Sequence, residues 1–338
     1  MDLPDGRILL ASASSDDTVR LWDPVTGTQQ KVLEGHTNTV NALCRVDLPD
    51  GRILLASASS DDTVRLWDPV TGTLQKVLEG HTDTVSAVCR VDLPDGRTLL
   101  ATASGDNTVR LWDPVTGTQQ LRLKAVFDRG LRRILNRGQF GLQAGEGALC
   151  TVDLPDERTL LASYASLGGR AIRLWDPVTG AQQHVLKHHR GWVMAVCTVD
   201  MPDGRILLAS ASSDDTVRLW DPVTGAQQRV LKGATGWVMT LCTVDLPDGR
   251  ILLVSAGAHA MCLWDPATGS QEYVLEGHTD WVSAVRTVGL PDGRALLATA
   301  SHDCTIRLWD LATRSRGSDH SKRHTGRISA LSRMDLSG

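Results

Sequence analysis

The feature that most constrains the fold is a repeat of the dipeptide Trp-Asp. It begins at residues 22, 67, 112, 175, 220, 264 and 309, so successive copies are 45, 45, 63, 45, 44 and 45 residues apart. The segment ASASSDDTVRLWDPVTG is present verbatim at 11–27, 56–72 and 209–225. Such self-similarity indicates one supersecondary unit used many times. Seven units span nearly all of the 338 residues, so the sequence predicts a single repeat domain, 1–338.

Each unit consists of short stretches rich in Val, Ile, Leu and Thr that are separated by turn signals. In the second unit the stretches TVNALCRV, RILLASAS, TVRLWD and QQKVL are separated by LPDG, SDD and PVTG. The stretches predict half-buried antiparallel strands, and the Pro and Gly residues suit tight turns. Four strands per unit, repeated radially, predict an all-β fold: a propeller of seven four-stranded antiparallel blades.

These features resemble the WD-repeat family of β-propellers, in the bacterial-type, G-protein-beta-like form with seven blades. Gly-His precedes three of the Trp-Asp dipeptides in constant phase, at 35–36, 80–81 and 277–278. The resemblance covers nearly the whole chain. It implies a non-catalytic scaffold that binds a protein or peptide partner and uses no cofactor.

The two ends of the chain complement each other. The first unit begins at its first turn, MDLPDG, and therefore lacks an innermost strand. The last unit contains only the segment that corresponds to this strand, RISALSRM. We expect the first blade to combine 1–33 with 327–338. Closing the ring in this way removes sheet edges that would otherwise invite aggregation.

The resemblance also implies a hydrogen-bonded tetrad in each regular blade, made of His, Ser or Thr, Asp and Trp. These groups can satisfy one another as donors and acceptors. A hydrolase needs one such set in a cleft, whereas five copies at one spacing favour a structural role and no catalytic residue. The expected sets are His36, Ser57, Asp61 and Trp67; His81, Thr102, Asp106 and Trp112; His189, Ser210, Asp214 and Trp220; His278, Thr299, Asp303 and Trp309; and, across the closure, His324 with Ser12, Asp16 and Trp22.

Two units depart from this pattern, and we expect both to be locally softer. The fourth has YASLGGRA in place of SSDD and no matching His, and the sixth has Ala234 in place of the His. A further repeated position, on the inner strand, holds cysteine. We interpret these residues as small buried hydrophobes rather than metal ligands, and we predict no metal site; they are Cys44, Cys89, Cys150, Cys197 and Cys242.

The units differ mainly in two loops. The turns LPDG and DPVTG scarcely vary and are expected on one face of the disc, here called the lower face. The loop before the inner strand and the loop around the tetrad Asp do vary, and both are expected on the opposite, upper face. Loops that diverge on a rigid frame are where binding specificity tends to reside.

One upper-face position, immediately before the inner strand, holds mostly Trp or Arg, which are frequent interface anchors. We therefore predict a partner-binding site at Thr39, Thr84, Trp192, Trp237, Trp281 and Arg327. The alternative is that the indoles pack on neighbouring loops and plug the channel.

An insertion at 124–147 is expected on the same face, between blades three and four. Its apolar residues have helical spacing, and Lys124 to Arg137 carries five positive charges against one negative. It could dock a partner or an anionic surface, although a solvated decoration is slightly favoured.

Composition narrows the function classes further. A net charge of −4 and a pI near 6.2 give no basic footprint for nucleic acid. The sequence contains no membrane-spanning run and no secretion signal, and its seven cysteines form no CxxC pair, so we expect a cytoplasmic, monomeric propeller. Two other classes stay open: a propeller enzyme or small-ligand-binding protein that uses the central channel, and an engineered or recently duplicated repeat protein without a defined partner.

Overall fold

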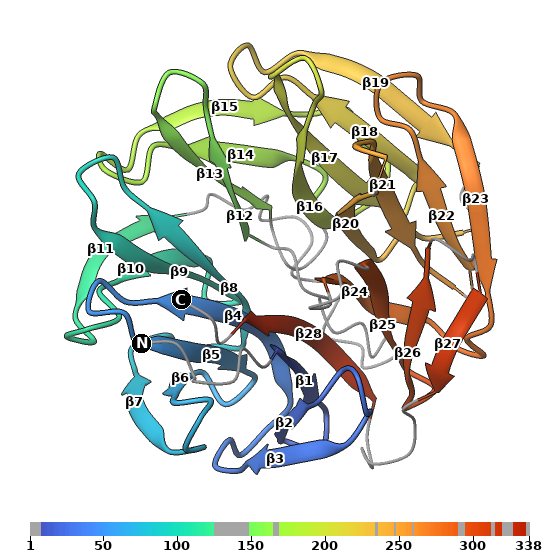
Figure 1. The fold of residues 1–338 in the computed structure, drawn as a ribbon. Coiled ribbons are helices and arrows are strands. Elements are labelled where there is room, and N and C mark those ends of the chain that lie inside the picture. The colour runs from blue at the N-terminus through green and yellow to red at the C-terminus, as the bar shows by residue number, and fades with distance from the viewer. Residues whose placement is uncertain are drawn as a thin grey trace, which may run out of the picture.

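Seven four-stranded antiparallel sheets are arranged around a central axis (Figure 1). The computed structural model describes residues 8–124, 149–164, 169–233, 236–246, 248–258, 260–289, 295–311, 315–319 and 327–335. The predicted all-β, seven-bladed propeller is confirmed. Within these ranges, no helix is long and apolar enough to cross a membrane.

The first three blades follow the unit boundaries seen in the sequence. Blade 1 contains β28 (Ile328–Asp335), β1 (Ile8–Ser14), β2 (Val19–Trp22) and β3 (Gln29–Leu33). Blade 2 contains β4 (Val40–Asp47), β5 (Ile53–Ser59), β6 (Val64–Trp67) and β7 (Leu74–Leu78). Blade 3 contains β8 (Val85–Asp92), β9 (Thr98–Ser104), β10 (Thr108–Trp112) and β11 (Gln119–Lys124).

The remaining four blades have the same strand order. Blade 4 contains β12 (Leu149–Asp153), β13 (Thr159–Tyr164), β14 (Ile172–Trp175) and β15 (Gln182–Leu186). Blade 5 contains β16 (Val193–Asp200), β17 (Ile206–Ser212), β18 (Thr216–Trp220) and β19 (Gln227–Lys232). Blade 6 contains β20 (Thr240–Asp245), β21 (Ile251–Ala256), β22 (Ala260–Trp264) and β23 (Gln271–Glu276). Blade 7 contains β24 (Val282–Gly289), β25 (Ala295–Ser301), β26 (Ile306–Asp310) and β27 (Ser315–Asp319).

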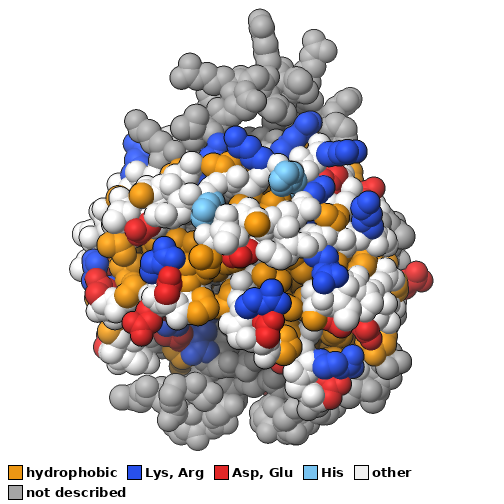
Figure 2. Space-filling view, turned by 90° about the horizontal axis from the view of Figure 1, so that it is seen from above, with side chains coloured by type: hydrophobic (Ala, Val, Ile, Leu, Met, Phe, Trp, Pro, Cys, Tyr) orange, Lys and Arg blue, Asp and Glu red, His pale blue; other side chains and the backbone are white. Residues whose placement is uncertain are grey.

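The second strand of each blade is buried on both faces because a neighbouring blade covers each face. In β5, six of the seven residues are buried. Their small Ala and Ser side chains let the sheets approach closely. The outer strands are different: β3 alternates between partly buried and exposed residues. Figure 2, a view of the rim, shows hydrophobic side chains interspersed with charges of both signs.

The tryptophan of each Trp-Asp dipeptide fills the interface with the preceding blade. Trp67 of blade 2 packs in one cluster with Leu21 and Leu33 of blade 1. Trp22 of blade 1 packs in the same way against Ala284 and Leu308 of blade 7. The repeat of Trp along the sequence is therefore a repeat of blade-to-blade contacts.

Strand β28 closes the ring. It pairs with β1 in antiparallel register, with Ala11 opposite Ser332 and Leu9 opposite Met334, and it packs between the inner strands β24 and β4. Ile328 and Leu331 are buried in the interface with blade 7. The predicted two-ended first blade is confirmed.

The inner strand of the irregular blade 6 is shorter than those of the regular blades. Strand β20 has six residues, whereas β4, β8, β16, β24 and β28 have eight each. Blade 4 also places Glu157 at a φ of 66°, where the other lower turns have glycine. Both features are local irregularities, and the lower local stability of these two blades stays a prediction.

We predict that deletion of residues 327–338 strongly destabilises the propeller. The deletion removes the buried side chains of β28 and leaves β1 without its partner. Losing buried Ile and Leu side chains costs several kcal/mol, which corresponds to a fall in Tm of roughly 10 °C or more, or to aggregation. Calorimetry measures the change, with Arg327→Ala as the control because its side chain is exposed. A truncated protein that melts within a degree or two of wild type would contradict the closure.

Candidate functional site

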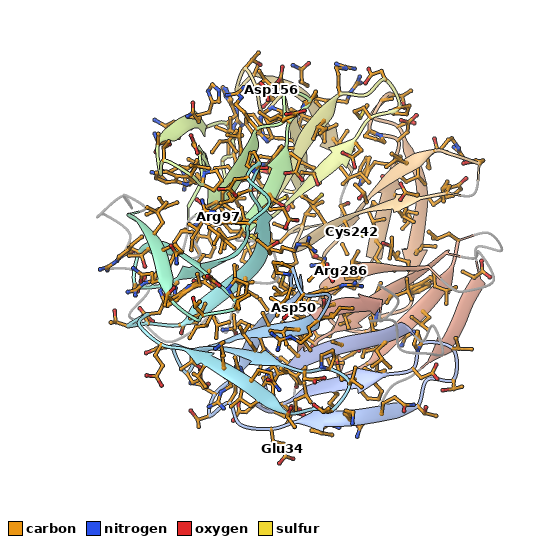
Figure 3. All side chains as sticks on the ribbon, turned by 60° about the vertical axis from the view of Figure 1, so that its left-hand side comes forward. Glu34, Asp50, Arg97, Asp156, Cys242 and Arg286 are labelled. Carbon is orange, nitrogen blue, oxygen red and sulfur yellow. The ribbon has the colours of Figure 1, made fainter. Side chains whose placement is uncertain are left out.

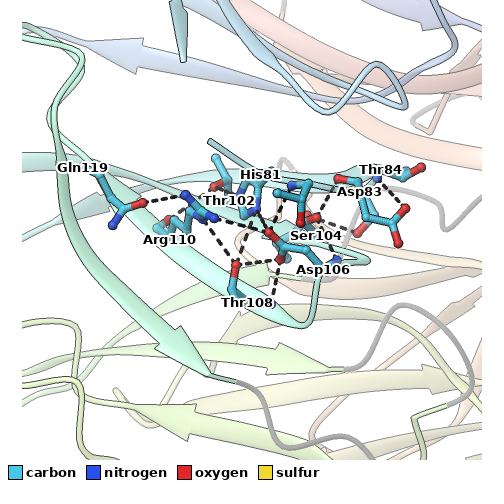
Figure 4. A network of polar contacts seen from close by, with 12 residues as sticks. His81, Asp83, Thr84, Thr102, Ser104, Asp106, Thr108, Arg110 and Gln119 are labelled. Atoms are coloured by element: carbon cyan, nitrogen blue, oxygen red, sulfur yellow. Dashed lines mark hydrogen bonds and ion pairs between the residues drawn. The ribbon is translucent and has the colours of Figure 1, made fainter. Parts of the chain in front are cut away.

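The polar network of blade 3 shows how the tetrad is built (Figure 4). The indole Nε1–H of Trp112 donates to Thr102 Oγ1 at 2.8 Å, and Thr102 Oγ1 lies 2.8 Å from His81 Nε2. The other ring nitrogen, His81 Nδ1, lies 2.9 Å from Asp106 Oδ2. The Thr108 hydroxyl also donates to Asp106 Oδ1 at 2.6 Å. The chain of bonds ties β9, β10 and the loop between them to the loop that precedes the blade.

Blades 2, 5 and 7 have the same geometry. The His Nδ1 to Asp Oδ2 distances are 2.7, 3.0 and 2.9 Å, for His36–Asp61, His189–Asp214 and His278–Asp303. The His Nε2 to hydroxyl distances are 2.8, 2.8 and 2.7 Å, to Ser57, Ser210 and Thr299. The indoles of Trp67, Trp220 and Trp309 donate to those hydroxyls at 2.8, 2.8 and 2.9 Å.

The other three blades keep only part of the network within the described residues. In blade 1, Trp22 donates to Ser12 at 2.7 Å, and Asp16 accepts from Thr18; His324 lies outside the described residues. The irregular blades, expected to lose the tetrad, still keep its innermost bond. Trp175 donates to Ser163, and Trp264 donates to Ser255, both at 2.8 Å.

The tetrads shift the pKa values of their members. Burial opposes ionisation of Asp106, yet hydrogen bonds from Thr108 and His81 lower its pKa to about 2. The pKa of Asp303 is lowered to about 2 for the same reasons. Burial lowers the pKa of His81 and of His189, although the partner carboxylate opposes the change. In blades 3 and 5 the pKa shifts of both partners therefore favour a neutral imidazole beside an ionised carboxylate.

The hydroxyls of the tetrads are sealed inside the blades. Ser57, Thr102, Ser210 and Thr299 are each 0% exposed. A nucleophile must reach its substrate, and these hydroxyls cannot. The Ser-His-Asp sets therefore act as supports between strands.

Three tryptophans of the upper face form a continuous aromatic cluster. The ring centroids of Trp192 and Trp237 are 6.2 Å apart, and those of Trp237 and Trp281 are 5.4 Å apart with the rings nearly perpendicular. Such distances and angles are typical of favourable aromatic pairs. All three indoles are partly exposed. We call Trp192, Trp237 and Trp281 the indole cluster.

The residues predicted beside these indoles occupy the same backbone position in other blades. The carbonyls of Thr39, Thr84, Trp192 and Trp281 accept from the loop around the tetrad Asp at 2.9 Å, and that of Arg327 does so at 3.0 Å. Their side chains differ in accessibility. Arg327 is exposed and Thr84 is partly exposed, but Thr39 is buried with 8% exposure. The assignment of Thr39 to the partner-binding site stays a prediction, and its burial leaves little side-chain surface for a contact.

Small residues permit the close approach of the loops around the indoles. A Cβ on Gly257 would lie 2.1 Å from the carbonyl oxygen of Trp237, and a Cβ on Gly191 would lie 2.5 Å from Ser213 Oγ. In blade 5 the Ser213 hydroxyl accepts from Trp192 N–H at 2.8 Å. In blade 7 the neighbouring Asp280 side chain caps Trp281 N–H at 2.8 Å instead. The loops of blades 5 and 7 thus hold equivalent tryptophans by different means.

The inner-strand cysteines are less buried than predicted. Cys242 is buried, but Cys44, Cys89, Cys150 and Cys197 are partly exposed, and all are free thiols. Figure 3 shows Cys242 and Arg286 near the centre of the ring, on β20 and β24. Burial raises the pKa of the Cys150 thiol to about 12. Within the described part of the chain, no three His, Cys, Asp or Glu side chains are grouped so that they could hold a metal ion.

Five segments match the family described as WD domain, G-beta repeat: residues 3–23, 27–68, 72–113, 180–221 and 269–310. Together they cover more than half of the chain. The chain belongs to the WD-repeat family. The Trp-Asp dipeptides of the fourth and sixth units of this WD-repeat protein, at Trp175 and Trp264, lie outside the matched segments, as expected from their irregular sequences. A comparison with curated proteins finds no match.

Sequence reasoning missed two contributors to these WD-repeat blades. The threonine two residues after each tetrad Asp donates to it, at 2.5–2.7 Å, and the serine two residues before it accepts from its backbone N–H, as Ser104 does at 3.0 Å. The repeated sequence SSDDT contains both the serine and the threonine, so this pattern could have identified them. Of the insertion predicted at 124–147, the structure describes only Lys124, and residues 125–147 lie outside the described ranges.

We predict that Asp61→Ala destabilises the WD-repeat propeller by about 1–3 kcal/mol, because it strands the buried imidazole of His36 without a partner. Urea unfolding measures the change. Asp62→Asn is the control, since it alters the adjacent residue and leaves the tetrad intact. An equal effect of both substitutions would show that the tetrad contributes nothing specific.

We also predict that stability falls in acid. Because the folded-state pKa values of His81 and His189 lie below the ordinary 6.5, the unfolded chain binds protons first, and stability declines as the pH falls below 6.5. The carboxylates of Asp106 and Asp303 add a second loss as the pH falls from 3.8 through about 2. The free energy of unfolding, measured by urea titration from pH 8 down, tests both. Stability that rises below pH 6.5 would contradict this account.

Proposed function

We propose that this protein is a non-catalytic interaction scaffold that binds a protein or peptide partner on the upper face of the propeller. The indole cluster is the observation that carries the proposal. Trp is the residue most enriched among interface anchors, and three neighbouring, partly exposed indoles form an apolar patch on a rigid frame. Thr84 and Arg327 extend the patch around the channel mouth.

The proposal extends to the state and location of the protein. We propose a monomeric propeller in the cytoplasm. The seven cysteines are all free thiols, which suits a reducing compartment.

A second role for the cluster is a plug that holds the channel mouth together. The mutual contacts of the three indoles favour it, because ring pairs stabilise the fold by themselves. The two roles differ in what is lost when the indoles are truncated. A plug loses stability, whereas an interface loses its partner.

We predict that the combined variant Trp192→Ala, Trp237→Ala, Trp281→Ala loses partner binding. Truncating an anchoring indole costs about 2 kcal/mol or more of binding free energy. Affinity capture from the native source, followed by titration with the captured partner, measures the loss. Thermal unfolding of the same variant reports any cost to the fold.

The matched control truncates exposed apolar residues on the lower turns: Val70→Ala, Val115→Ala, Val223→Ala. It should bind the partner as wild type does. Retained binding by the indole variant, together with a large fall in its Tm, would identify a plug and contradict the proposed interface.

A further inference from the structure

Five upper-face loops of blades 1, 2 and 3 form an acidic arc. These loops, 15–18, 34–39, 60–63, 79–84 and 105–108, are all described by the structure and contain neither Lys nor Arg. The loop before β28 of blade 1 is not part of the arc, and its described residue Arg327 is positive. They carry eight acidic residues: Asp16, Asp17, Glu34, Asp61, Asp62, Glu79, Asp83 and Asp106. Positive residues stand in other described upper-face loops, at Arg327 of blade 1, Arg170 of blade 4, and Lys187 and Arg190 of blade 5. The five loops of the arc therefore carry a local excess of negative charge.

Two carboxylates of the arc lie outside the tetrads and between blades 2 and 3. Asp83 is exposed, with its side chain beside Gly105 and one oxygen accepting from Thr84 N–H at 2.8 Å. Asp62 lies close enough that burial and then the charge of Asp83 raise its pKa. Every charged neighbour that shifts Asp62 is another acid, so the local field is negative.

The acidic arc and the indole cluster lie on the same face of the propeller. The loops that lead into the inner strands of blades 5, 6 and 7 carry the indoles, and β24 of blade 7 packs against β28 of blade 1, where the arc begins. A chain lying across this face therefore meets aromatic surface on one side and carboxylates on the other. Arg327 stands at the junction, where the charges of Asp16, Asp280 and Asp303 also act.

We propose that the upper face binds a cationic peptide segment in which arginine or lysine accompanies large apolar side chains. Its apolar groups pack on the indole cluster, where a guanidinium also gains from an aromatic face, and its charges face Asp62 and Asp83. Charge complementarity sets the orientation and speeds encounter. This inference rests on the proposed function, since it gives the chemistry of the same partner site.

The test uses three fluorescein-labelled peptides of equal length, alternating Arg with Leu, Glu with Leu, and Arg with Ser. Fluorescence anisotropy at low and high salt gives the Kd of each. We expect the Arg–Leu peptide to bind most tightly, and we expect its affinity to fall with added salt because exposed charges are screened.

The decisive variant is Asp62→Asn, Asp83→Asn. The protein's own repeats already contain these replacements, since Asn107 occupies the position of Asp62 at the same φ of 66°, and Asn38 caps Thr39 N–H as Asp83 caps Thr84. Folding is therefore preserved. We expect the variant to bind the Arg–Leu peptide about fivefold more weakly.

The matched control is Asp50→Asn, Asp95→Asn, which removes the same charge from the lower turns of the same two blades. It should change the Kd less than twofold. If both double variants weaken binding of the Arg–Leu peptide equally, the effect comes from the net charge of the protein alone, and the inference is overturned.

Other outcomes separate this inference from the proposed function. If the Glu–Leu peptide binds at least as tightly as the Arg–Leu peptide and the indole variant loses it, the cationic partner is wrong and the upper-face site stands. If the indole variant binds the Arg–Leu peptide as wild type does, the site itself is wrong. If neither Leu-containing peptide binds wild type, the cationic inference is overturned.

Discussion

Burial of the blade faces depends on the neighbouring blades, because one thin sheet cannot cover its own hydrophobic faces. The tryptophan of each Trp-Asp dipeptide occupies the interface with the preceding blade, as Trp67 does against Leu21 and Leu33. A row of such interfaces has two open ends, whereas a ring has none. The pairing of β28 with β1 converts the row into the ring, so every other contact depends on that pair.

A closed frame permits its two faces to differ. On the lower face, Asp and Arg pair within the corresponding described turns of blades 2 to 6, as Asp50 and Arg52 do at 2.8 Å, and the turns vary little. On the upper face, equivalent loops pack against each other through different residues in different blades. Asp83 packs against Gly105 in blade 3, whereas Gly191 makes room for Ser213 in blade 5. Such exchanges let side chains at the channel mouth diverge while the strands beneath them stay the same.

Much of the fold could be predicted from the sequence because the repeat contains residues with strong local preferences, such as β-branched residues for strands and Pro and Gly for turns. The resemblance to the WD-repeat family implied that His81, Thr102, Asp106 and Trp112 lie together, and the unit boundaries located the closing strand. The indole cluster was harder to foresee. Its members were identified by their position in the repeat, but the distances between them depend on how neighbouring blades are rotated about the axis.

The misses have the same origin. Thr39 and Thr84 occupy equivalent positions in the repeat, yet Thr39 is buried and Thr84 is partly exposed. The cysteines of the inner strands look like core residues by composition, but most of them are only partly buried in the ring. Because blades 4 and 6 lack the tetrad His, the sequence predicted that the whole tetrad was lost. The hydrogen bond from the indole to the hydroxyl nevertheless remains in both blades. Each of these facts depends on three-dimensional surroundings that no single repeat contains.

Native-state hydrogen exchange under increasing denaturant tests most directly whether the ring behaves as one closed unit. The hydrogen-bonded amides of β1 and β28 should exchange with the same free energy and denaturant dependence as those of β16 and β17 in blade 5, because opening the closure opens the ring. If the amides of β28 exchange through a local opening of much lower free energy while β16 and β17 stay protected, the pair does not hold the ring together, and this account of the fold is wrong.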